Sequence, residues 1–189
     1  MEVQVNTLKK VVQDLKNQNK SLKKKINNLE DKILTIRGKT KFFINLPPES
    51  NCVFQKLTDF INLTKQKIII LTPNLDSTVV NLLVNTMKKN KISIQIITNE
   101  RRRIRNDRPD LIKGFDALQL NSVITHIFNS NTKESVILQD DKNLLLSSTS
   151  LSEEDLNEKF NFLIMIEDDF LVERFKVQFN EQFPPFLRS

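Results

Sequence analysis

The sequence lacks tryptophan and tyrosine altogether, and has one cysteine, one histidine and two glycines in 189 residues. The single cysteine, Cys52, excludes an internal disulfide bond and any metal site built from several cysteines. No apolar run approaches the roughly 20 residues that span a membrane, and the N-terminus MEVQVNTLKK lacks the apolar core of a secretory signal. We therefore expect a reducing compartment, cytoplasmic or, in a eukaryote, nuclear, and the sequence indicates no cofactor and no metal.

The remaining composition is typical of a folded soluble protein, with 39% hydrophobic and 28% charged residues. Thirteen phenylalanines without tyrosine or tryptophan predict a core built from phenylalanine. The net charge of +6 is concentrated at the start of the chain: residues 1–40 hold ten Lys or Arg and four acids, and the other 149 residues balance at 19 against 19. A basic N-terminal element thus precedes a neutral domain, which indicates two different roles.

The basic N-terminal element has the apolar periodicity of a coiled coil. Between residues 5 and 36 the pattern recurs at alternating intervals of three and four, without Gly or Pro. β-Branched residues at the a positions and leucine at the d positions favour a parallel two-stranded coil, and Asn19 at an a position determines register and dimerisation. We predict a dimerisation helix over 1–38, followed by a domain over 39–189. The seam consists of Val5, Leu8, Val12, Leu15, Asn19, Leu22, Ile26, Leu29, Ile33 and Ile36.

The flanks of this seam are mostly lysine, so a homodimer gains few ion pairs. Only the pair of Lys25 with Glu30 across the dimer is attractive, whereas Lys32 faces Arg37. The basic surface fits an anionic partner such as nucleic acid, or an acidic partner helix. A solvated lysine face without a partner, an antiparallel pairing, and packing of the helix on its own domain are the alternatives.

Residues 39–189 alternate between strand and helix patterns, which predicts an α/β fold. The apolar strand in QKIIILTPN, a helix over 76–89 and the strand in ISIQIITN form a unit typical of a buried parallel sheet. Four strand candidates with short connections follow, so the sheet should be mixed and flanked by helices. The other expected elements are a strand in KFFINLPPES, a helix over 51–65, strands in VITHIF, ESVILQ, NLLLSS and FNFLIMI, and a last helix over about 168–183.

Ligands of such sheets bind beyond the carboxyl ends of the parallel strands. Two of these ends are Thr72–Asn74 and Thr98–Glu100, and the second runs into a basic segment. Because the planar guanidinium of arginine suits phosphate and carboxylate, this segment predicts an anion site. A solvated turn, partly paired with Glu100, Asp107 and Asp110, is the alternative. The cations are Arg101, Arg102, Arg103, Arg105 and Arg108.

The order of elements resembles phospholipase D-like domains over roughly residues 41–183. The segment KIIILTPNLDSTVVNLLVNTMKKNKISIQIITN looks like the opening strand–helix–strand unit of that family. The segments SVILQDDKNLLLSSTSLS and NFLIMIEDDFLVERFKVQF look like its closing strands and helix. A coiled coil before such a domain also resembles the C-terminal part of TrmB-type transcriptional regulators. This chain has no room for their winged helix before Leu8, which argues against DNA reading by a helix in a groove.

The family's catalytic motif is His-x-Lys-x4-Asp, followed by Gly-Ser-x-Asn and an acidic residue. In that family the His attacks phosphorus, the Lys binds the phosphate, and the Ser and Asn complete the pocket. Here Lys133 stands at the position of the His, Ser135 at that of the Lys and Asp140 at that of the Asp. Ser148 keeps the Ser of the second motif, and Asn161 falls near the acidic position. The nucleophile is therefore missing, because a protonated lysine ammonium cannot attack phosphorus.

The resemblance thus implies a scaffold that binds an anion through hydroxyl groups and cations without cleaving it. One alternative is that the segment after residue 139 is a hairpin turn between two core strands. Another is a catalytic His126, although an isolated histidine on a strand is more often structural. The predicted anion pocket consists of Lys133, Ser135, Asp140, Ser148, Ser150, Arg101, Arg102, Arg103 and Arg105.

These observations predict a non-catalytic dimeric regulator or scaffold, associated with transcription or DNA. No aromatic stacking platform is visible, so contacts with nucleic acid should be mostly to phosphates. A structural subunit that pairs through the coil with a different chain is one alternative, and an active nuclease or phospholipase with altered residues is another. The expected partners are a second copy of the chain and, through the basic coil, nucleic acid or an acidic protein.

Overall fold

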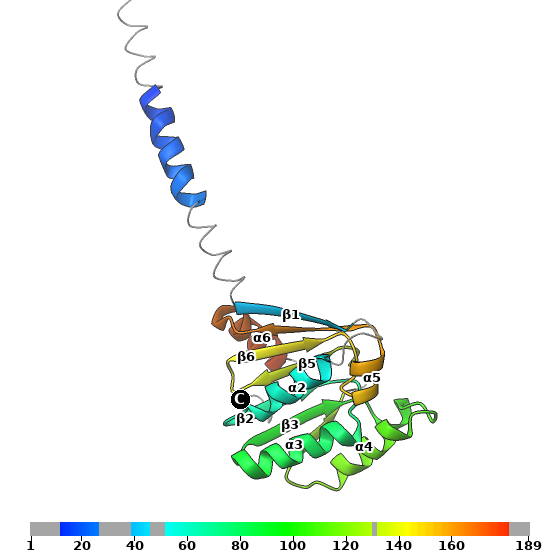
Figure 1. The fold of residues 1–189 in the computed structure, drawn as a ribbon. Coiled ribbons are helices and arrows are strands. Elements are labelled where there is room, and N and C mark those ends of the chain that lie inside the picture. The colour runs from blue at the N-terminus through cyan, green and yellow to red at the C-terminus, as the bar shows by residue number, and fades with distance from the viewer. Residues whose placement is uncertain (1–11, 27–38, 46–51, 130–131, 182–189) are drawn as a thin grey trace, which may run out of the picture. The chain divides into compact units, whose positions relative to one another are not determined.

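The computed structural model describes residues 12–26, 39–45, 52–129 and 132–181. The chain divides into two compact units, Met1–Lys39 and Thr40–Ser189. The second unit is built on a seven-stranded sheet with the strand order β1-β7-β6-β5-β2-β3-β4, and helices pack on it (Figure 1). The prediction of an α/β fold with a mixed sheet is confirmed.

Every strand expected from the sequence is present, and the structure adds two helices that the sequence did not predict, α4 and α5. In α4, Pro109 occupies the first turn, and Leu111, Phe115 and Leu118 are buried at helical spacing. This spacing is the signal that could have revealed the helix. The elements are β1 (Thr40–Asn45), α2 (Cys52–Asn62), β2 (Lys67–Leu71), α3 (Ser77–Asn90), β3 (Ser93–Thr98), a 3-10 turn (Arg101–Arg103), α4 (Pro109–Gln119), β4 (Thr125–Phe128), β5 (Ser135–Gln139), β6 (Asn143–Ser147), α5 (Glu153–Glu158), β7 (Asn161–Ile166) and α6 (Asp169–Glu181).

The sheet joins a parallel half to an antiparallel half at β2. Strands β2, β3 and β4 are parallel, whereas β5, β6, β7 and β1 are each antiparallel to their neighbours. The directions bring the carboxyl ends of β1, β2, β3, β4 and β6 to the same edge as the amino ends of β5 and β7. We call this edge the carboxyl edge.

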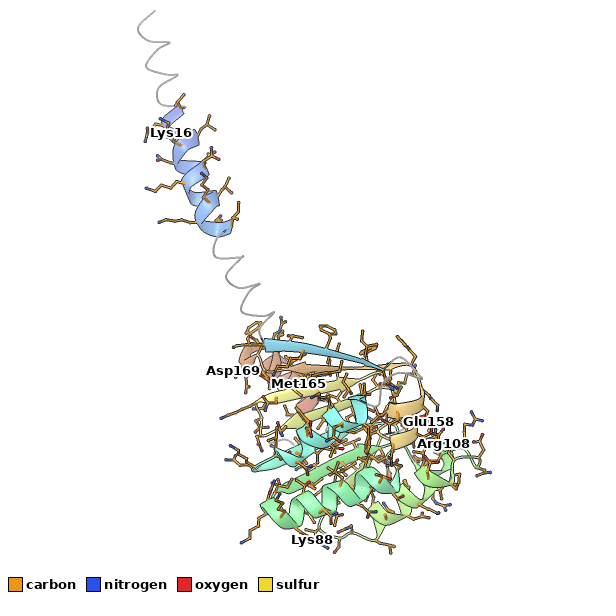
Figure 2. The ribbon with its side chains drawn as sticks, in the orientation of Figure 1. Lys16, Lys88, Arg108, Glu158, Met165 and Asp169 are labelled. Atoms are coloured by element: carbon orange, nitrogen blue, oxygen red, sulfur yellow. The ribbon has the colours of Figure 1, made fainter. Side chains whose placement is uncertain are left out.

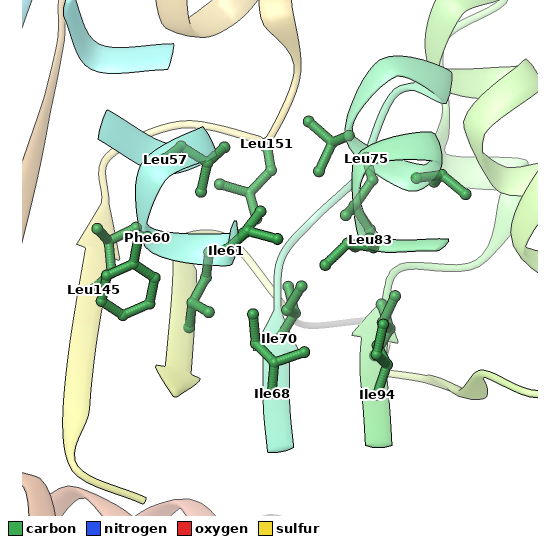
Figure 3. Close-up of a cluster of buried hydrophobic side chains, with 14 of the residues drawn as sticks. Leu57, Phe60, Ile61, Ile68, Ile70, Leu75, Leu83, Ile94, Leu145 and Leu151 are labelled. Carbon is green, nitrogen blue, oxygen red and sulfur yellow. The ribbon is translucent and has the colours of Figure 1, made fainter. Parts of the chain in front are cut away.

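The core is aliphatic. Side chains from α2, α3 and β2, among them Leu57, Leu83 and Ile70, point toward one another in the main cluster (Figure 3). The prediction of a phenylalanine core is wrong: Phe42 and Phe170 are 67% and 68% exposed. Alternation along the strands buries Ile and Leu, whereas many phenylalanines lie on the edge strand β1, around β7 and on α6. Among the described residues, the buried phenylalanines are Phe60 and Phe115.

The N-terminal unit is helical over residues 12–26. The apolar seam residues of this stretch, Val12, Leu15, Leu22 and Ile26, are 48%, 53%, 54% and 52% exposed. The helix that the periodicity predicts is thus present over residues 12–26, and pairing into a coiled coil stays a prediction. The seam positions Val5, Leu8, Leu29, Ile33 and Ile36 lie outside the described residues.

Candidate functional site

The hydroxyl group at the position of the family's phosphate-binding lysine is held inside the protein. Ser135 opens β5 at the carboxyl edge and is 1% exposed. Its Oγ donates to the carbonyl oxygen of Thr149 at 2.5 Å and lies 2.6 Å from Oγ1 of Thr72 at the end of β2. The hydroxyl is therefore satisfied by its own chain, and a phosphate has no access to it.

Lys133 lies just before β5 and is exposed. Its neighbour Thr132 is buried and anchored, because the side-chain amide of Asn99 donates to the Thr132 carbonyl oxygen at 3.0 Å. Lys133 thus extends from a fixed backbone at the carboxyl edge. Its ammonium group can attract an anion but is not a nucleophile.

The other positions of the second motif also serve the fold. Backbone N of Phe162 donates to Oγ of Ser148 at 3.2 Å, which ties β6 to β7, and Ser150 is half-buried. Asn161, near the position of the family's acid, is fully buried. Its amide donates to the carbonyl oxygens of Asp155, Leu156 and Lys159 at 2.8, 3.0 and 2.9 Å. Asn161 therefore satisfies carbonyls at the end of α5, which helices leave without partners.

Asp140 does not lie with the other predicted pocket residues, which corrects that assignment. It follows the carboxyl end of β5, at the opposite edge of the sheet from Ser135. Its carboxylate accepts hydrogen bonds from the backbone N of Lys65, Gln66 and Lys67 at 2.9, 2.8 and 3.0 Å. Asp140 and Asp141 have φ of 51° and 56° and form the turn between β5 and β6, as the hairpin alternative predicted.

The arginine segment lies at the carboxyl edge and is open to solvent. The side chains of Arg101, Arg102 and Arg105 are 59%, 79% and 80% exposed, and Arg103 is exposed as well. Arg101 pairs with Asp116 at 3.1 Å, Arg105 with Asp107 at 2.5 Å, and Arg102 with Glu100. Exposed ion pairs contribute only about 0–1 kcal/mol, so these guanidinium groups can exchange their carboxylates for phosphate at little cost.

Arg108 differs from these arginines because it is built into the fold. Its side chain is 17% exposed and lies 2.9 Å from Asp110 and 3.1 Å from Asp155 of α5, and Figure 2 shows it beside α5. Hydrogen bonding to Asp110 raises the pKa of Arg108 despite its partial burial. Burial alone would raise the pKa of Asp155, but hydrogen bonds from Lys159, Arg108 and Ser152 hold it below its ordinary value. Arg108 therefore connects α4 to α5 and is not available as an anion ligand.

His126 is enclosed between aromatic rings. Its ring lies 5.6 Å from that of Phe115 and 4.9 Å from that of Phe128. The Gln119 amide donates to Nδ1 at 2.8 Å, so Nε2 carries the proton and donates to Oγ1 of Thr98 at 2.8 Å. Burial lowers the pKa of His126 to about 4. The imidazole is therefore neutral at pH 7, with both nitrogens occupied.

The depression between α3, α4 and α5 does not fit a phosphate. It has a volume of about 390 Å³ and is lined mainly by the carboxylates Asp76, Asp110, Glu153, Glu154 and Glu158. Within the described ranges, no three His, Cys, Asp or Glu side chains are placed to hold a metal ion. Over the same ranges, no helix combines the length and apolar character needed to cross a membrane.

The comparisons with known proteins show the fold. No family model matches the sequence, and no curated protein matches it. Among solved structures, NucT from Helicobacter pylori has a TM-score of 0.62 and 17% identity over 76% of this chain and 94% of its own. The phospholipase D family member Nuc from Salmonella typhimurium has a TM-score of 0.59 and 17% identity over the same shares.

A third structure, TrmBL2, is described as an archaeal chromatin protein with a novel mode of DNA binding. It has a TM-score of 0.52 and 12% identity over 94% of this chain and 68% of its own. At these identities the likeness concerns the backbone and not the site. The chain has the fold of phospholipase D-like domains.

Proposed function

We propose that this protein is a non-catalytic, dimeric regulator or scaffold that associates with DNA through phosphate contacts. The observation that carries the proposal is the state of Ser135, whose hydroxyl bonds Thr72 and Thr149 where the family's motif has a phosphate-binding lysine. Lys133 replaces the nucleophile with a cation, and Asn161 replaces the acid with a cap of α5. The scaffold of a phosphodiesterase site is thus kept, while its polar groups support the fold.

The dimer is supported by the helix over residues 12–26. Its seam side chains are about half exposed in the isolated chain, although a soluble monomer rarely presents a continuous apolar stripe to water. Asn19 interrupts the stripe at one a position, as dimeric coils often do. Pairing of two copies buries the stripe and gives each Asn19 a partner.

Association with DNA is supported by two groups of exposed cations. The helix carries Lys16, Lys20 and Lys23–Lys25, with Asp14 as its acid in the described stretch. The carboxyl edge of the sheet carries the arginine segment Arg101–Arg105. The structural similarity of TrmBL2, which extends over 94% of this chain, adds a DNA-binding protein with the same fold. Cations without base-reading groups give affinity for phosphates and little sequence preference.

The test is fluorescence anisotropy of the full chain with a random DNA duplex at two salt concentrations. Three double variants remove equal charge: Lys20→Gln with Lys24→Gln on the helix, Arg102→Gln with Arg103→Gln at the carboxyl edge, and Lys88→Gln with Lys89→Gln at the end of α3. Because each double variant removes four cations from the proposed dimer, we expect the first two to flatten the log–log salt slope by about 4 and the third to leave it unchanged. Absence of binding at low salt would refute DNA association.

The absence of catalysis has its own measurement. We expect no hydrolysis of bis(p-nitrophenyl) phosphate above the buffer rate by the full chain. Turnover that disappears in Lys133→Ala or His126→Asn would show that an unrecognised nucleophile operates. A folded variant such as Lys88→Gln controls for a contaminating phosphodiesterase, because contamination follows the preparation and not the substitution.

A structural subunit that binds an acidic protein through the lysine-rich helix is the second candidate function. Its supporting observation is the same excess of lysine over acids in residues 12–26, which an acidic partner helix would neutralise. Two measurements separate the candidates. If nucleic acid is the partner, the unmodified chain binds DNA and the Lys20 and Lys24 variant binds it more weakly. If the protein is a structural subunit, the unmodified chain binds no DNA and forms a defined heterodimer with an acidic coil.

A further inference from the structure

Among the described elements, fewer helices cover one face of the sheet than the other. Helices α2, α3, α4 and α5 pack on the face that contains Ile70 and Ile96. Of the described elements, only α6 packs on the opposite face, through Val172 and Phe175, and it lies behind the sheet in Figure 1. Seven strands about 4.8 Å apart make a sheet about 29 Å wide, and a helix is about 10 Å across. Within the part of the chain that the structure describes, a large part of this face therefore has no covering helix.

The open part of this face includes an apolar strip over β1 and β7. We define the β1–β7 strip as Phe42, Ile44, Phe162 and Ile164. The register places them on one face, because Phe42 pairs with Ile164 and Ile44 with Phe162. Phe42, Ile44 and Phe162 are 67%, 52% and 37% exposed, and Ile164 is half-buried. Contiguous apolar side chains that are exposed on one face of a strand pair are typical of an interaction surface.

The charge of this face decides the class of partner. Among the strand residues whose side chains share the face with the strip, the charged one is Lys67, which lies on β2 and pairs with Asp141 at 3.5 Å. A nucleic acid needs cations at its contact surface, so it does not fit the strip. An apolar protein surface does, because it removes the phenylalanine and isoleucine side chains from water.

We propose that the β1–β7 strip contacts the same strip of a second copy of this chain. This inference rests on the dimeric coil of the proposed function. The heptad seam ends at Ile36 and β1 begins at Thr40, so at about 3.6 Å per residue no more than about 14 Å of chain joins them. Helices of a parallel coil lie about 8–10 Å apart. The short tether limits how far each β1 can lie from the paired seam, and a two-fold dimer presents the same patch of each copy to its counterpart.

Sedimentation equilibrium of the full chain tests this contact. The strip variant is Phe42→Thr with Ile44→Thr, because threonine keeps strand propensity while removing the apolar surface. The control variant is Leu120→Thr with Val123→Thr, which changes side chains that are 88% and 69% exposed outside the strip. We expect the strip variant to raise the dimer Kd at least tenfold and the control variant to change it less than twofold.

Charge reversal separates a lost contact from a lost fold. Phe42→Glu and Phe42→Lys should each weaken the dimer, and an equimolar mixture of the two should dimerise more tightly than either, because opposite charges within one small contact attract where like charges repel. A mixture as weak as either variant, or a strip variant within twofold of the unmodified Kd, overturns the inference and leaves DNA association standing. A monomeric unmodified chain overturns both the coil and the strip. Dimers that weaken with the strip but bind no DNA support the strip and refute DNA association.

Discussion

Asp140 accepts hydrogen bonds from three consecutive backbone amides while its own backbone has a φ of 51°. Both properties suit aspartate, whose short carboxylate bonds the backbone and which tolerates the left-handed region. The residue at the Asp position of the catalytic motif thus has a structural role, fixing the chain before β2 to the turn after β5. This structural role requires no chemistry at the site.

Replacement of Asp140 by alanine should destabilise the protein by about 2–4 kcal/mol. The variant loses hydrogen bonds to a charged group and leaves at positive φ an alanine, which lacks the short polar side chain that lets aspartate tolerate this conformation. Asp140→Asn keeps one acceptor oxygen and tolerates the positive φ, so it should cost less than Asp140→Ala. Urea unfolding of both variants measures the difference. Equal losses would show that neither the acceptor nor the φ tolerance of asparagine matters.

His126 should make stability depend on pH below neutrality. Its pKa is about 4 in the folded protein, below the ordinary value of about 6.5 that applies to the unfolded chain. Between these values the unfolded state binds a proton that the folded state does not, so stability falls as pH falls from about 6.5 to about 4. Thermal unfolding at intervals through this window should show a decline that His126→Asn lacks. A parallel decline in the variant would assign it to other groups.

At the scale of elements, α4 approaches the chain before α3 so closely that glycine is required. A β-carbon at Gly114 would lie 2.2 Å from the carbonyl oxygen of Leu75 and 2.8 Å from the α-carbon of Asp76. These are backbone atoms and cannot rotate away. Asp76 also accepts hydrogen bonds from the backbone N of Val79 and Glu153, so a shift of this segment disturbs both α3 and α5.

Gly114→Ala should therefore destabilise the domain by about 3 kcal/mol or more, through overpacking that the backbone has to absorb. In an open helix the same change would stabilise by about 1 kcal/mol. Lys113→Ala, one residue away on the exposed side of α4, is the matched control and should change stability little. A Gly114→Ala variant that unfolds at the same urea concentration as the unmodified protein would contradict the close approach.

The strands were predictable because their apolar runs are short and bounded by Pro, Asn and Asp, whereas their order was not. Nothing in the local pattern of β5 indicates that it pairs with β2, 65 to 71 residues earlier. The helix α5 has six residues, too few for a periodic signal.

In the candidate site, the replacement of the motif residues was visible in the sequence. The hydrogen bonds that hold the Ser135 hydroxyl inside the protein could not be predicted from the sequence, because Thr72 follows a different strand.

At the scale of the whole molecule, Asn19 should restrict the oligomeric state. Asn19→Ile makes the seam continuously apolar, which should raise the thermal stability of the assembly and admit oligomers other than the dimer. Asn17→Ile, at an outward position of the same helix, is the control. Circular dichroism melts and sedimentation velocity of the full-length variants measure both effects. An unchanged dimer with unchanged melting would show that residue 19 does not lie in a helix–helix seam.

The pairing of β1 with β7 has a consequence for the order in which the protein is made. Lys41 of β1 forms an ion pair with Glu167, 126 residues later in the chain. At about 5–20 residues per second, a ribosome needs roughly 6–25 s to reach this partner after β1 emerges. The helical segment is complete before that interval begins, so we expect two nascent chains to associate while β1 still waits for β7. Assembly would then precede completion of the sheet, and neighbouring ribosomes on one messenger would supply both copies.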